Sequence, residues 1–182
     1  MARQNSIVAT AQLHDRPVVL ELLPRAAYEA AYTAVVGTIG FAFETQYGTH
    51  ALGSDRRVPF YTRPNTLAYL PVGCDVYSRS SGGGEYLHIR LPDWTPAKAR
   101  QINDVLAPQA IWAAHAIRRA LLTAPEGDAL EIPIAVLADA VSGVFAPEYP
   151  PAPRSHSLTS RRLHTATDPS LPCDSKYPFT GS

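Results

Sequence analysis

Between residues 6 and 91, apolar and polar side chains alternate along several short stretches with a period of two. This pattern is typical of β-strands that turn one face towards a core and the other towards more polar surroundings. In residues 37–45 the side chains of Ile39, Phe41 and Phe43 share one face. We also expect strands at residues 6–13, 17–23, 67–70, 75–79 and 86–91, a strand or irregular structure at 26–36, and a loop at 46–58 with a short strand at 49–52.

Glycine and proline mark where the expected strands end. Pro71 and Gly73 follow residues 67–70, because proline has no N–H for a ladder hydrogen bond and glycine permits a sharp turn. Residues 80–84 include three consecutive glycines and predict a hairpin turn. They do not predict a phosphate loop, since no helix N-terminus follows them. Short strands separated in this way favour a small β-barrel or sandwich.

The periodicity changes to that of a helix after residue 91. Thr95 and Pro96 are typical of a helix start, and Ile102 and Val105 would give this first helix a short apolar stripe. Further helices are expected at about 109–122 and at about 133–145. The expected fold is therefore mainly β with C-terminal helices, in which a barrel at residues 6–92 precedes a segment of two or three α-helices at 95–145.

Composition limits the remaining possibilities. The chain has 182 residues, 46% of them hydrophobic, and a formal net charge of zero, which suits one domain and provides no long-range attraction to nucleic acid or anionic membranes. No membrane span or secretory signal is recognisable, so we expect a cytoplasmic protein. Cys74 and Cys173 are expected to be free thiols. Residues 146–182 are rich in proline and serine and are expected to be disordered.

Asn65, Pro71, Gly73 and Val76 fall on the spacing G-x5-P-x-G-x2-H. This spacing resembles the second signature of the cupin family, which implies a double-stranded β-helix barrel. Asn65 replaces the glycine, and a turn tolerates this because asparagine adopts left-handed backbone conformations. Val76 replaces the histidine that a metal-dependent cupin needs as a ligand. The resemblance therefore implies the barrel without its metal chemistry.

Two longer stretches resemble the sensing domain of AraC-type transcription regulators. They are residues 39–57, IGFAFETQYGTHALGSDRR, and residues 71–87, PVGCDVYSRSSGGGEYL. Residues 157–163, SLTSRRL, resemble the opening of the DNA-binding domain of the same family, which carries two helix-turn-helix units. The resemblance ends near Asp168, so residues 157–168 are interpreted as a remnant of that domain. The prolines that follow leave no room for a recognition helix, so we expect no specific DNA binding by this chain alone.

Candidate chemistry is sparse. A metal site needs two or three histidines and a carboxylate that converge, but of the six histidines only His50 and His88 fall in expected barrel segments. No H-x-H pair and no G-x-S-x-G motif occurs, and Cys74 has no histidine near it in sequence. We therefore expect no metal, no cofactor and no catalytic residue.

Aromatic residues on the expected strands allow two interpretations. Their side chains line a ligand cavity, or they simply fill the barrel. The resemblance to effector-binding domains supports the cavity. The candidate ligand-binding residues are Phe41, Phe43, Tyr69, Tyr77, Tyr86 and His88.

The expected helix at 109–122 has an apolar face that allows two interpretations as well. It forms a dimer interface, or it packs on the barrel. Domains of the resembled family pair through helices after the barrel, which implies a homodimer or a heterodimer with an intact regulator. The candidate interface residues are Trp112, Ala113, Ala116 and Ile117.

The sequence thus favours a non-catalytic regulatory module that senses a small-molecule effector and dimerises, similar to the sensing half of an AraC-type regulator without a working DNA-binding half. The alternative is a small cupin enzyme, either an isomerase or a metal-dependent dioxygenase. A bound redox metal would distinguish the dioxygenase from the sensor.

Overall fold

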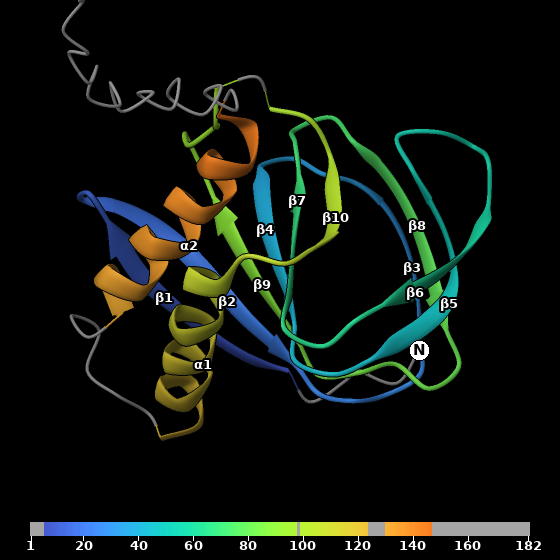
Figure 1. The fold of residues 1–182 in the computed structure, drawn as a ribbon, viewed down its shortest axis with the longest axis horizontal. Coiled ribbons are helices and arrows are strands. Elements are labelled where there is room, and N and C mark those ends of the chain that lie inside the picture. Colours follow the sequence, from blue (N-terminus) through green and yellow to red (C-terminus); the bar gives the residue numbers. More distant parts are fainter. Residues whose placement is uncertain (1–5, 98, 124–129, 147–182) are drawn as a thin grey trace, which may run out of the picture. The chain divides into compact units, whose positions relative to one another are not determined.

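A computed structural model describes residues 6–97, 99–123 and 130–146. Within these ranges the chain forms ten strands followed by two helices (Figure 1). The strands are β1 (Ile7–Leu13), β2 (Arg16–Leu23), β3 (Tyr28–Thr33), β4 (Gly37–Ala42), β5 (Gln46–Leu52), β6 (Val58–Thr62), β7 (Thr66–Leu70), β8 (Asp75–Ser80), β9 (Tyr86–Leu91) and β10 (Ile102–Val105). The helices are α1 (Pro108–Thr123) and α2 (Glu131–Phe145).

The strands form two antiparallel sheets that face each other. The six-stranded sheet has the order β1-β2-β9-β4-β7-β10 and the four-stranded sheet the order β3-β8-β5-β6. The central strands β2 to β9 thus form two four-stranded layers, β2-β9-β4-β7 and β3-β8-β5-β6, which is the strand order of a jelly roll. This confirms the expected fold class, a mainly β, cupin-like double-stranded β-helix followed by C-terminal helices.

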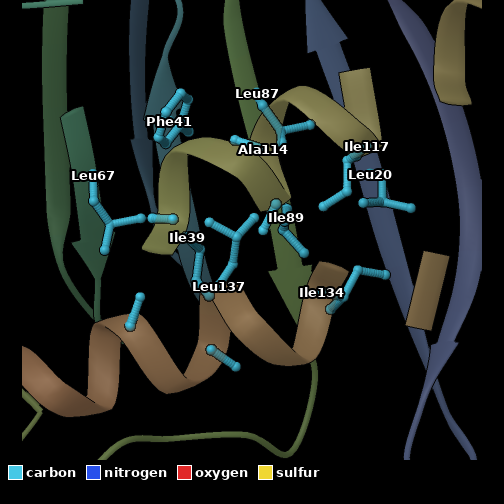
Figure 2. Packing of buried hydrophobic residues seen from close by; sticks show 14 of the residues in the cluster. Leu20, Ile39, Phe41, Leu67, Leu87, Ile89, Ala114, Ile117, Ile134 and Leu137 are labelled. Atoms are coloured by element: carbon cyan, nitrogen blue, oxygen red, sulfur yellow. The ribbon is translucent and has the colours of Figure 1, made fainter. Parts of the chain in front are cut away.

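The two helices cover the outer face of the six-stranded sheet. Figure 2 shows side chains of the sheet, among them Leu20, Ile39 and Leu87, meeting Ile117 of α1 and residues of α2. Most of these side chains are almost completely buried. Burial of one such aliphatic side chain contributes about 1.5–3 kcal/mol, so this layer is the main hydrophobic core of the described residues.

Strand β9 shows how the two faces of the six-stranded sheet differ. Leu87, Ile89 and Leu91 point outwards and are buried beneath the helices, whereas Tyr86 and His88 point inwards and are only half-buried. The alternation follows from the period of a strand, in which successive side chains point to opposite faces. The more apolar face of this sheet therefore contacts the helices, not the interior of the barrel.

Two turn positions of the cupin-like signature have the backbone conformation that their residue types allow. Asn65 has a φ of 60° and Gly73 a φ of 79°, both in the left-handed region. The prediction that Asn65 replaces glycine in a left-handed turn is confirmed. Cys74 is a buried free thiol, as expected, while Cys173 lies outside the described residues.

Some elements differ from those expected. The prediction of a first helix after Thr95 is wrong. Ile102 and Val105 belong to strand β10 instead, and they pair with Tyr69 and Leu67 of β7. The barrel thus extends beyond residue 92, into the segment expected to be helical, because the free edge of β7 offers backbone hydrogen bonds to whichever segment passes it.

Other elements were expected only in part. Residues 26–36 contain strand β3, and the loop at 46–58 is largely strand β5. Strand β6 was not foreseen. None of the described helices is long and apolar enough to span a membrane. The expected disordered tail, with its remnant at residues 157–168, lies outside the described residues except for residue 146.

Candidate ligand cavity

A cavity of about 770 Å³ lies between the inner faces of the two sheets. Volumes of 300–1,000 Å³ are typical of sites for small organic molecules. The exposed lining residues Tyr32 and Val35, the latter 82% exposed, indicate where the cavity opens to solvent. The barrel is therefore hollow, and its interior is accessible.

Small residues on the inner face of β4 and β7 make room for the side chains of neighbouring strands in the cavity. Gly40 of β4 pairs with Ala68 of β7 on one side and with His88 of β9 on the other. A methyl group at position 40 would overlap the Tyr86 hydroxyl, so the phenol ring occupies the place of the missing side chain. Gly40 therefore determines where Tyr86 lies in the cavity.

Tyr86 and His88 form a neighbouring aromatic pair on this wall. Their ring centroids are 5.1 Å apart and the ring planes are inclined by 76°. Within the described residues, neither the Tyr86 hydroxyl nor the His88 ring makes a hydrogen bond to protein. Both side chains keep some accessible surface because they face the cavity, although they lie in the interior of the barrel. Their polar atoms are thus available to a bound molecule.

Both groups are uncharged at neutral pH. Burial lowers the pKa of His88 to about 4; the nearby Glu21 carboxylate opposes this shift and Arg90 adds to it. Burial likewise raises the pKa of Tyr86 above its ordinary value. The neutral imidazole offers one donor and one acceptor, and the phenol offers a donor with an acceptor oxygen.

An ion pair lies beside this pair of rings. Glu21 of β2 is directly opposite His88 in the sheet, and Arg90 Nη2 donates a hydrogen bond to Glu21 Oε2 at 2.5 Å. Charge-assisted bonds of this kind are stronger than neutral ones. The two charges therefore neutralise each other within the wall.

The opposite wall belongs to the four-stranded sheet. The Tyr28 hydroxyl lies 3.2 Å from the Ser78 hydroxyl and 3.4 Å from Gln46 Oε1. His50 is stacked on Phe60 with a centroid distance of 4.9 Å, and burial lowers the pKa of His50. This wall thus combines polar side chains that already have partners with an aromatic surface.

Of the candidate ligand-binding residues, the structure brings only Tyr86 and His88 to the cavity. Phe41 and Tyr69 lie on the opposite face of the six-stranded sheet, in the core beneath the helices. Phe43 packs against His115 of α1 at a centroid distance of 5.2 Å. Tyr77 donates a hydrogen bond to Glu29 and lies 3.8 Å beneath the Arg57 guanidinium. These four side chains do not line this cavity, because alternation defines two faces without showing which one encloses it.

Several cavity residues were missed from the sequence, among them Glu21, Arg90 and Tyr28. A usable signal was present in two strands. Glu21 interrupts the apolar run of β2, and His88 and Arg90 alternate with leucine and isoleucine in β9. Polar residues at regular positions in otherwise apolar strands indicate a face that is neither core nor open surface.

The cavity does not fit the metal site of the cupin signature. Val76, at the position of the signature histidine, lines the cavity with an apolar side chain. Among the described residues, no three histidine, cysteine or carboxylate side chains are grouped so that they could hold a metal ion. We therefore assign no metal-dependent step to this site.

The expected dimer face is divided between two environments. Ala113 and Ile117 are 0% exposed and belong to the core of this chain, so their side chains are not on its surface. They point towards the sheet because helix α1 packs on it. Trp112 is 58% exposed, and Ala116 is half-buried. Only the Trp112 side of the helix remains for a partner.

Comparison with known proteins gives similarities to solved structures alone; no family model and no curated protein matches the chain. A cupin-family protein with a double-stranded β-helix fold from Methanocaldococcus jannaschii is 13% identical; the match covers 50% of this chain and 84% of that chain, with a TM-score of 0.36. A cupin-superfamily protein from Desulfitobacterium hafniense is 16% identical; the match covers 51% of this chain and 84% of that chain, with a TM-score of 0.36. The cupin-like fold rests on the strand order, since similarities of this size carry no argument about function.

Proposed function

We propose that this protein is a non-catalytic module that binds a small molecule in its barrel, as the sensing domain of an AraC-type regulator does. The observation that carries the proposal is the hollow barrel of about 770 Å³ with two polar groups, Tyr86 and His88, that have no protein partner within the described residues. A barrel stabilised only by its own packing would have a filled interior. The sequence stretches 39–57 and 71–87 support the regulatory assignment.

The structure offers a route from the cavity to helix α1. Strand β9 carries Tyr86 and His88 on its inner face and Leu87, packed among core residues, on its outer face. Glu85, just before this strand, forms an ion pair with Arg118 of α1, with a distance of 2.6 Å between Nε and Oε2. A ligand that shifts β9 would therefore change the packing of α1, which is what a sensing module requires.

The binding function is tested by blocking the cavity. Ala30 of β3 lines the cavity, whereas its neighbour Ala31 is exposed on the other face of the same strand. Ala30→Trp should reduce the volume available to a ligand, and Ala31→Trp is the matched control. We would screen a small-molecule library by thermal shift and confirm binders by calorimetry. Binders should lose affinity for Ala30→Trp at least tenfold and keep it for Ala31→Trp; the absence of any such binder would contradict the proposal.

An isomerase is the second candidate, and the adjacency of His88 and Tyr86 favours it. A neutral imidazole opposite a carboxylate and beside a phenol resembles a base and an acid placed on one wall. If a ligand is converted, His88→Gln should reduce turnover at least a hundredfold while its affinity changes little. A sensor would show no turnover with either protein.

A further inference from the structure

The charged side chains around the cavity leave no net charge for a ligand to meet. Glu21 and Arg90 are paired at 2.5 Å. Glu29 also borders the cavity, but its carboxylate accepts a hydrogen bond from Tyr77 and lies 4.0 Å from Arg79, both directed away from the interior. Neither a carboxylate nor an ammonium group on a ligand would therefore find a free counter-charge.

The polar groups that do lack partners are uncharged. The Tyr86 hydroxyl needs an acceptor, and the His88 ring needs one donor and one acceptor. A ligand that displaces solvent from these atoms without bonding to them leaves them unsatisfied and loses affinity, so a ligand with a matching donor and acceptor is favoured. Hydroxyl and amide groups offer both a donor and an acceptor.

The rest of the wall is largely apolar. Phe60 presents the aromatic surface described above, and Leu52, Leu70 and Val76 border the cavity with aliphatic side chains. Apolar walls with a few polar groups are typical of sites for organic molecules that have a hydrophobic body.

We propose that the cavity accepts an uncharged organic molecule with an apolar body and a hydroxyl or amide group that meets Tyr86 and His88. This inference rests on the proposed binding function and adds the chemical class of the ligand. A charged ligand is disfavoured because burial of an ion without a counter-charge is costly.

The test uses three probes with the same ring and different charge: 2-naphthamide, 2-naphthoate and 2-naphthylmethylammonium. Dissociation constants are measured at pH 7.5 by calorimetry, and binding in the cavity is checked with Ala30→Trp. We expect 2-naphthamide to bind at least tenfold more tightly than either ion. Tyr86→Phe should weaken its binding about three- to tenfold, since one hydrogen bond is lost. Tyr77→Phe removes a hydroxyl that lies outside the cavity and should leave the affinity unchanged.

The outcomes separate this inference from the binding function. Equal or tighter binding of one of the ions, abolished by Ala30→Trp, would overturn the charge argument and leave the binding function standing. Equal loss of 2-naphthamide affinity in Tyr86→Phe and Tyr77→Phe would overturn the role of Tyr86. Failure of all three probes to bind the wild-type protein would overturn the ligand class, whereas the binding function is decided separately by the library screen with Ala30→Trp.

Discussion

His88 lies opposite Glu21 on one neighbouring strand and opposite Gly40 on the other, and its ring is on the inner face of the six-stranded sheet. Burial disfavours the charged form of the imidazole more strongly than the Glu21 carboxylate stabilises it. Protonation of this one residue would place a positive charge beside an ion pair that is already balanced. The residue thus links the stability of the barrel to pH.

The sign of this dependence follows from the two pKa values. His88 has a pKa of about 4 in the folded protein, below its ordinary value of 6.5, so the unfolded chain binds more protons between these pH values. The free energy of unfolding should fall as the pH falls from about 6.5 to about 4, by up to about 3 kcal/mol from this group. In His88→Gln, the difference between the free energies of unfolding at pH 7 and at pH 4.5, measured by urea denaturation, should be smaller by this contribution. His14→Gln, which replaces an exposed histidine, is the control, and equal pH dependence in all three proteins would contradict the assignment.

Gly40 and Tyr86 should be energetically coupled. A methyl group at position 40 would overlap the phenol, so Gly40→Ala should cost about 1–3 kcal/mol. The cost should be smaller in a Tyr86→Ala background, and a double-mutant cycle from chemical denaturation measures the difference. Gly82→Ala is the control, because the nearest atom to its added methyl group is a Tyr47 oxygen at 3.7 Å. Additive effects of Gly40→Ala and Tyr86→Ala would show that the ring does not depend on Gly40.

At the scale of elements, the strands β2, β9, β4 and β7 of the six-stranded sheet each serve two purposes. Their outer residues build the core with α1 and α2, and their inner residues line the cavity. The helices therefore stabilise the barrel, since without them an apolar face of the sheet would be exposed to water.

Helix α2 offers a matched test of this role. Ile134 is 0% exposed and Ile132 is 70% exposed, and both belong to the same helix. Ile134→Ala should reduce the free energy of unfolding by about 2–4 kcal/mol, as is typical of buried isoleucine. Ile132→Ala should change it by less than about 0.5–1 kcal/mol. Denaturant titration measures both, and equal effects would mean that α2 does not pack as described.

At the scale of the whole molecule, association remains a proposal. The part of α1 that faces away from the core carries Trp112, and exposed tryptophan side chains are frequent anchors of protein interfaces. We propose a homodimer in which this residue is buried. Because Trp112 is exposed in the single chain, its replacement should not disturb the core.

Trp112→Glu should therefore convert a dimer to a monomer without lowering the melting temperature by more than about 2 °C. Light scattering coupled to size-exclusion chromatography gives the mass, and a thermal melt gives the stability. Val72→Glu, at another exposed apolar position, is the control and should remain dimeric. A wild-type protein that is monomeric at high concentration would contradict the proposal.

Metal content is a further property of the whole molecule. Because Val76 occupies the position of the signature histidine, we expect the purified protein to contain less than stoichiometric iron, manganese, zinc or nickel. Elemental analysis after gel filtration measures this ratio. One tightly held metal ion per chain would instead support the dioxygenase alternative.

The sequence by itself determined the elements that depend on local chemistry. The period of two in residues 37–45 and 86–91 predicted strands β4 and β9, and the helical spacing predicted α1 and α2 to within a few residues. The left-handed turn at Asn65 also followed from its residue type. These features depend on near neighbours in the chain, so a sequence pattern records them directly.

Only the tertiary structure decided which face of each strand encloses the cavity. Phe41 and His88 lie on opposite faces of one sheet, and both faces are removed from solvent, one by the helices and one by the second sheet. An alternating pattern distinguishes the two faces but does not show what covers each of them. Strand β10 is a similar case, because residues 102–105 become a strand only beside the free edge of β7. Both outcomes depend on segments far apart in the chain, and for that reason the local pattern does not contain them.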